Sequence, residues 1–141
     1  MTRRVGILSV LLALLVAALA AAQNSGTEGS GAEGDISRYR VPANLVELVE
    51  DGEGDFIIVD VRTPAEYRAG HIPGAVNIDY REIGERPPQV DRDALVVTYC
   101  RSGARASRAQ ATLERMGFEN VVNFGGVASW PEELVTGDSP R

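Results

Sequence analysis

Apolar and polar positions follow two different periods along this chain. Nearly continuous apolar runs at residues 56–61 and 95–99 predict strands that are buried on both faces. Residues 42–51 and 104–116 repeat apolar positions every three to four residues, which predicts amphipathic helices. Shorter segments predict strands at 75–78 and 121–124, short helices at 64–70 and 127–130, and an edge strand at 39–41. This alternation predicts an α/β domain with a central parallel sheet flanked by helices on both faces.

The two ends of the chain depart from this pattern. Residues 1–22 place Arg3 and Arg4 before an apolar run that ends in three alanines, which predicts a secretory signal peptide. The expected product is exported, to the periplasm or the medium; an uncleaved leader that anchors the chain in a membrane is the alternative. Residues 23–35 lack large apolar side chains and predict a flexible linker. The domain is then expected over 36–135, with a disordered tail at 136–141.

Charge narrows the range of partners. All 14 basic residues among the 141 are arginine, and 20 acidic residues give a net charge of −6. Without Arg3 and Arg4 the balance is 12 against 20, or −8. An acidic surface argues against nucleic acid as a partner, and it restricts membrane contact to an uncleaved leader. Arg101, Arg105 and Arg108 form a local exception around the one cysteine, although Arg108 is equally well explained as a solvated helix residue.

The sequence contains one cysteine, Cys100, which is the last residue of a predicted strand. It has no partner for an internal disulfide, so it is inert, paired with another chain, or kept as a reactive thiol. The small residues Ser102, Gly103 and Ala104 allow the following loop to curl and to point backbone N–H groups at the sulfur. Gly103 is free to take the positive φ that such a curl requires. A thiol held there should ionise readily, which favours the reactive alternative.

A second strand end carries Asp60 and Arg62. The carboxyl ends of parallel strands lie at one edge of a sheet, so both residues are expected near Cys100 as supporting groups. Asp60 either tunes the thiol or bonds buried backbone amides. Arg62 and Glu66 are four residues apart, which predicts an ion pair across the start of a helix.

Three segments together resemble the rhodanese family, and in particular its single-domain, exported bacterial thiosulfate sulfurtransferases. They are DVRTPAEYRAGHIPGAVNI at 60–78, CRSGAR at 100–105 and NFGGVASW at 123–130. The resemblance covers nearly all of the foldable chain. It implies that Cys100 is the catalytic residue and becomes a persulfide, and that His71 stabilises a turn. Trp130 is expected in the core. The loop residues expected to bind the substrate and the persulfide are Arg101, Ser102, Gly103, Ala104 and Arg105.

The implied reaction has two steps and needs no cofactor, since one histidine and one cysteine are too few ligands for a metal site. Cys100 takes the outer sulfur of thiosulfate, sulfite leaves, and cyanide or a thiol accepts the sulfur. Arg101 and Arg105 are expected to hold the sulfonate end, and the protein is expected to be a monomer. A cysteine phosphatase or arsenate reductase of related fold is less compatible, because those loops place five residues between Cys and Arg and this loop has four. A partner-binding module and a persulfide carrier between proteins stay open.

Overall fold

The computed structural model describes residues 34–139, which contain a four-stranded parallel sheet. The predicted signal peptide and the linker up to residue 33 lie outside the described residues. Strand order in the sheet is β2-β1-β3-β4, and every neighbouring pair is parallel. The central strands are the two apolar runs seen in the sequence. The strands are β1 (Phe56–Asp60), β2 (Val76–Asn77), β3 (Leu95–Cys100) and β4 (Asn120–Gly126).

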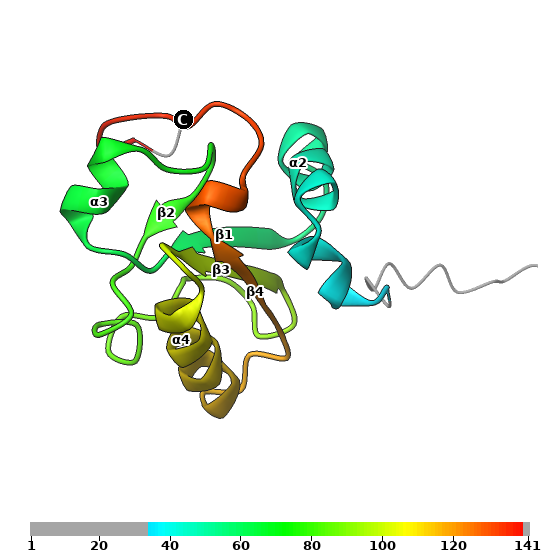
Figure 1. Cartoon of the computed structure of the whole chain (residues 1–141). Helices are drawn as coiled ribbons and strands as arrows, with labels where there is room; N and C mark the ends of the chain where they lie inside the picture. The colour runs from blue at the N-terminus through cyan, green and yellow to red at the C-terminus, as the bar shows by residue number, and fades with distance from the viewer. Residues whose placement is uncertain (1–33, 140–141) are drawn as a thin grey trace, which may run out of the picture. The chain divides into compact units, whose positions relative to one another are not determined.

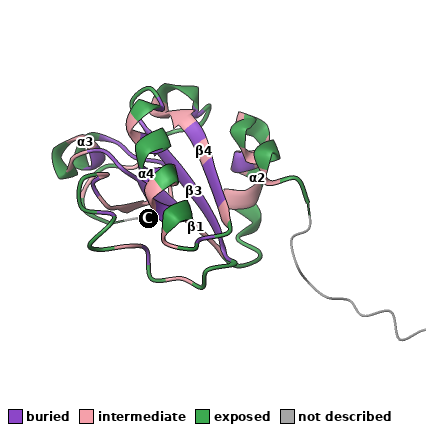
Figure 2. Ribbon diagram, turned by 90° about the horizontal axis from the view of Figure 1, so that it is seen from below, coloured by how far each residue is buried: buried purple, intermediate pink, exposed green. Residues whose placement is uncertain are grey.

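Helices cover both faces of this sheet, which confirms the predicted α/β fold. Helix α2 (Pro42–Asp51) lies on one face and α4 (Ala104–Arg115) on the other (Figure 1). The short α3 (Pro64–Ala69) follows β1. In Figure 2 β3 is buried along its whole length and β1 and β4 in part, whereas α4 is exposed along its outer side. None of the helices within residues 34–139 has the length and apolar character needed to cross a membrane.

Strand β3 divides its side chains between two apolar clusters. Leu95, Val97 and Tyr99 join the cluster on the α2 face, while Val96 and Cys100 join the cluster on the α4 face. Successive side chains of a strand point to opposite faces, so the position of Cys100 in the strand places its sulfur beside α4. The position of Cys100 in the strand therefore determines that its side chain lies on the α4 face of the sheet.

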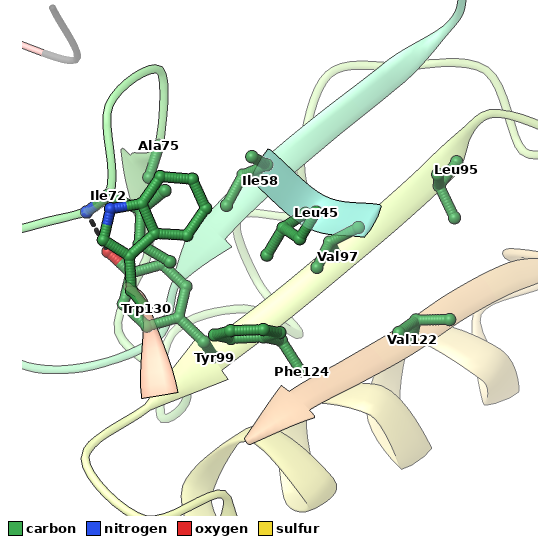
Figure 3. Packing of buried hydrophobic residues seen from close by; sticks show 10 residues of the cluster. All are labelled: Leu45, Ile58, Ile72, Ala75, Leu95, Val97, Tyr99, Val122, Phe124 and Trp130. Atoms are coloured by element: carbon green, nitrogen blue, oxygen red, sulfur yellow. Dashed lines mark hydrogen bonds between the residues drawn. The ribbon is translucent and has the colours of Figure 1, made fainter. Parts of the chain in front are cut away.

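The cluster on the α2 face contains Leu45 of α2, Tyr99 of β3 and Trp130, which follows the short 3₁₀ helix η2 (Val127–Ser129) (Figure 3). The prediction that Trp130 belongs to the core is confirmed, since only 8% of it is exposed. Leu45 is completely buried, and burial of a leucine side chain stabilises a fold by about 1.5–3 kcal/mol.

The first ordered segment differs from the prediction. Residues 39–41 do not form an edge strand; a 3₁₀ helix, η1 (Ile36–Arg40), precedes α2 instead. The Asp35 carboxylate accepts a hydrogen bond from the Ser37 backbone N–H at 3.0 Å and caps this helix. Ile36 and Tyr39 pack against the cluster on the α2 face. This packing and the cap favour the helical turn over an extended strand.

The other end of the domain extends past the predicted boundary at residue 135. Gly137 donates its backbone N–H to the carbonyl oxygen of Arg68 at 3.0 Å. His71 pairs with Val135 as an antiparallel bridge, and one of its ring nitrogens lies 2.8 Å from the carbonyl oxygen of Ser139. Residues 136–139, assigned from the sequence to a disordered tail, thus lie against α3 and the turn that follows it.

Candidate active site

Cys100 is the last residue of β3, and its side chain is completely buried. In the sheet it lies opposite Gly126 of β4. A side chain at Gly126 would place its Cβ 2.5 Å from the carbonyl oxygen of Arg101. The glycine therefore lets the loop that follows Cys100 pack directly on β4.

Gly103 turns this loop back toward the sulfur. Its φ of +94° lies in the left-handed region, where a residue with a side chain would be strained. A Cβ at this position would also lie 3.3 Å from the Cα of Gly125. In this conformation the Gly103 backbone N–H donates to the sulfur of Cys100 at 3.0 Å.

The surroundings of the thiol favour its ionised form. Burial alone opposes ionisation, but the backbone N–H groups of Ala106, Ser102, Gly103 and Arg105 outweigh it and lower the pKa of Cys100. These donors belong to the loop and to the first turn of α4, where backbone N–H groups have no partner within the helix. These backbone donors therefore stabilise a thiolate at Cys100, and the Arg105 side chain adds a positive charge beside it.

Arg105 lies beside this thiol and is fixed by Glu66, which the sequence predicts to pair with Arg62 instead. Both terminal nitrogens of the Arg105 guanidinium bond the Glu66 carboxylate, each at 2.8 Å. The ion pair holds the pKa of Glu66 down to about 2, and it raises the pKa of Arg105. Glu66 also accepts the hydroxyl and backbone N–H of Thr63, so it caps α3 and orients the arginine at once.

The remaining loop residues are open to solvent. Arg101, Ser102 and Ala104 are exposed. Within residues 34–139 no carboxylate lies within ion-pair distance of Arg101. Arg101 therefore differs from Arg105 in having a guanidinium that is free to meet an anion.

Asp60 and Arg62 lie at the same sheet edge but bond each other instead of the loop. Arg62 Nε donates to Asp60 Oδ1 at 2.9 Å, and an Arg62 terminal nitrogen donates to the carbonyl oxygen of Gly70 at 2.6 Å. Both side chains are almost completely buried. Burial opposes the charged form of Arg62, but the Asp60 carboxylate raises its pKa overall. The pair is thus an internal brace of the fold.

The predicted ion pair between Arg62 and Glu66 is therefore wrong. Thr63 is the N-cap of α3 and Pro64 its first residue, so Arg62 precedes the helix. The four-residue rule applies only where both residues are helical. Arg62 instead pairs with Asp60 in the interior, and Glu66 pairs with Arg105.

His71 is buried and bonds only backbone. Its Nδ1 lies 2.9 Å from the carbonyl oxygen of Tyr67, its Nε2 contacts Ser139, and its ring stacks on that of Tyr67. None of these contacts involves the Cys100 loop. Within the described part of the chain, no group of three or more His, Cys, Asp or Glu side chains is placed to hold a metal ion.

A buried cysteine among backbone donors, at the carboxyl edge of a parallel sheet, is an arrangement suited to chemistry that uses a thiolate as nucleophile. Comparison with known proteins narrows this class. A sequence profile of the rhodanese-like domain matches residues 41–133, and the chain belongs to the rhodanese family.

Its relatives include sulfurtransferases. The chain is 43% identical over 88 residues to a sulfurtransferase of Allochromatium vinosum, covering 62% of this chain and 81% of the relative. It is 37% identical over 71 residues to the thiosulfate sulfurtransferase PspE of Escherichia coli, covering 49% and 68%. A solved rhodanese with anions from E. coli superposes with a TM-score of 0.54 at 34% identity, over 58% of this chain and 99% of that one. These relatives support sulfur transfer as the general activity.

Proposed function

We propose that this protein transfers the outer sulfur of thiosulfate, through a persulfide on Cys100, to a thiol or to cyanide. The observation that carries the proposal is the loop itself. Four residues separate Cys100 from Arg105, and the curl they form points the Gly103 N–H at the sulfur from 3.0 Å. Such a cradle suits one extra sulfur atom on the thiolate better than the wider tetrahedral phosphate.

In the first step the Cys100 thiolate attacks the outer sulfur of thiosulfate. A bond forms between the two sulfurs, and the bond from the outer sulfur to the sulfonate group breaks. Sulfite departs with the bonding electron pair, and a cysteine persulfide stays in the loop. The backbone donors that lower the pKa of Cys100 also stabilise the negative charge of this persulfide.

In the second step a nucleophile attacks the outer sulfur of the persulfide. Cyanide leaves as thiocyanate, or a thiolate leaves as its own persulfide. The electron pair of the sulfur–sulfur bond returns to Cys100 and restores the thiolate, so no oxidant or reductant is consumed. The cycle needs only the donor and the acceptor.

The two loop arginines divide the binding of the donor. Arg101 is exposed and has no carboxylate partner among the described residues, so it is placed to attract a dianion to the mouth of the loop. Arg105 is held beside the sulfur by Glu66 and offers its charge from a fixed position. Ser102 and Ala104 line the loop with small side chains, and Ser102 contributes its backbone N–H to the sulfur.

The proposed setting is outside the cytoplasm, and it rests on the charge and apolar pattern of residues 1–22. In that setting a small anionic sulfur donor reaches the monomeric domain by diffusion. A free thiol in that setting is liable to oxidation. Burial of Cys100 protects it, and its use as the catalytic nucleophile gives a reason for a free cysteine there.

Turnover tests the proposal. Incubation of the protein without its leader with thiosulfate and cyanide should release sulfite and form thiocyanate in equal amounts. Replacing cyanide by a small thiol should also yield sulfite. Sulfite release without turnover by either acceptor would overturn the proposed acceptors and favour a persulfide carrier between proteins. No sulfite release from folded protein would overturn the proposed donor.

A further inference from the structure

Strand β4 becomes irregular where it passes the Cys100 loop. Thr98 of β3 pairs with Asn123, but the next residue, Tyr99, pairs with Gly125. Phe124 is therefore an extra residue in β4, a β-bulge, and its side chain is buried in the cluster on the α2 face. Bulges re-aim neighbouring side chains, and here the neighbour on the α4 side is Asn123.

Both the nitrogen and the oxygen of the Asn123 side-chain amide form hydrogen bonds within the protein. Its Nδ2 donates to the carbonyl oxygen of Gly103 and to the hydroxyl of Ser107, both at 3.0 Å. Its Oδ1 accepts the backbone N–H of Gly125 at 2.9 Å. The Gly125 N–H can only donate and the Gly103 carbonyl can only accept, so these two partners fix which way the amide points.

Of the three partners of the Asn123 amide, the Gly103 carbonyl links Asn123 to the Cys100 sulfur, because Gly103 also bonds that sulfur. The same residue donates its N–H to the sulfur of Cys100 at 3.0 Å, and its carbonyl also accepts the Ser107 N–H at 2.9 Å to begin α4. A glycine has no side chain of its own to hold it in place, and its backbone is the most mobile of any residue. The bond from Asn123 supplies the restraint that glycine lacks.

We propose that Asn123 is a positioning residue, which holds Gly103 so that its N–H stays on the Cys100 sulfur and stabilises negative charge there. The proposal rests on the proposed function in one respect: sulfur transfer is the reaction in which Cys100 becomes negatively charged. Its geometry, however, stands on the contacts of Asn123 alone. Asn123 touches neither the sulfur nor any group that reacts.

The experiment measures the rate of Cys100 alkylation by iodoacetamide as a function of pH, without any sulfur donor. The test variant is Asn123→Val, because valine suits a strand and keeps similar bulk. Asn120→Ala is the matched control: Asn120 lies in the same strand and donates to a backbone carbonyl, that of Asp93, at 2.7 Å, but at the opposite end. Ser107→Ala removes the other Asn123 contact and keeps the bond to Gly103. Thermal unfolding shows that each variant is folded.

In Asn123→Val the midpoint of the alkylation profile should move to higher pH, and the rate at pH 7 should fall roughly threefold to tenfold, because a hydrogen bond to a charged group has weakened. Asn120→Ala and Ser107→Ala should follow the wild-type profile. A folded Asn123→Val with the wild-type profile overturns the proposal, and so does an equal shift in Asn120→Ala. If valine prevents folding, Asn123→Ser replaces it, with the same expected shift and the same overturning result.

This readout separates the two proposals. A shifted profile in Asn123→Val, together with no sulfite release by the folded wild-type protein, supports the positioning role and contradicts thiosulfate as donor. Wild-type sulfite release with an unshifted Asn123→Val profile supports the donor and contradicts the positioning role.

Discussion

The ends of β1 and β3 lie side by side at one edge of the sheet and handle charge in opposite ways. Asp60 is paired with Tyr99, the neighbour of Cys100, in the sheet register. At the end of β1 an aspartate and an arginine neutralise each other inside the protein, and Asn77 bonds the carbonyl oxygens of both. At the end of β3, backbone N–H donors surround the Cys100 sulfur. These donors interact more strongly with the negatively charged thiolate than with the neutral thiol.

This difference separates stability from reactivity within a few residues. A closed pair contributes to the fold and takes no part in chemistry, because its charges have no unmet partner. A cradle of donors contributes little to the fold while the thiol is neutral, and it favours the charged forms that the reaction passes through. Variants at the end of β1 should therefore lower stability, whereas variants at the end of β3 should lower activity.

The largest expected effect is on activity, at the end of β3. Cys100→Ser should lower sulfite release from thiosulfate at least about a thousandfold, because the hydroxyl does not ionise and cannot carry the sulfur. The unfolding free energy should change by no more than about 1–2 kcal/mol, since the two side chains are similar in size. Denaturant unfolding and a sulfite assay check both parts. Residual turnover near the wild-type level would show that another group is the nucleophile.

The next largest effect is on stability, at the end of β1. Arg62→Met leaves the buried Asp60 carboxylate without its charge partner, and we expect a loss of about 3–5 kcal/mol in denaturant unfolding. Adding Asp60→Asn should restore part of that loss, because the buried charge is then removed. The folded fraction of the double variant should still release sulfite. A loss of stability below about 1 kcal/mol in Arg62→Met contradicts the role of a brace.

A smaller effect is expected at Arg105, where the two functions meet. Arg105→Ala should raise the KM for thiosulfate about tenfold, because one charge-assisted contact to the donor is lost. The Glu66 pair is about a third exposed, so its loss should lower the unfolding free energy by no more than about 1 kcal/mol. Arg86→Ala removes an exposed ion pair of Arg86 with Glu82 and serves as the control. Equal KM values for the two variants would remove Arg105 from donor binding.

The smallest effect is a pH dependence of stability. The pKa of Glu66 falls from an ordinary 4.5 to about 2 in the folded protein. A lowered carboxylate pKa stabilises the fold above pH 4.5, and this contribution disappears as the pH falls from 4.5 to 2. Wild type and Glu66→Gln should therefore differ in unfolding free energy at pH 7, by no more than about 1 kcal/mol after solvent screening. The difference should vanish about one pH unit below the folded-state pKa of about 2; one that persists there would not come from the ion pair.

Local patterns in the sequence predicted the strands, the helices and the strand end that carries Cys100, because apolar periodicity reports burial directly. The pairing of Glu66 with Arg105 was missed, since it joins residues 39 positions apart. A reading of Thr63 and Glu66 as a capping box would have moved Glu66 away from Arg62. The contact of Asn123 with Gly103 spans 20 positions and depends on a bulge that no local pattern announces.

Formation of a persulfide on Cys100 can be measured by mass spectrometry. The wild-type protein is incubated with thiosulfate, freed of excess donor, and its intact mass is determined together with a peptide map. We expect a gain of one sulfur atom on Cys100, which is lost again on addition of cyanide and is absent from Cys100→Ser. An unchanged mass in folded wild-type protein, or a sulfur atom located anywhere else, would contradict it.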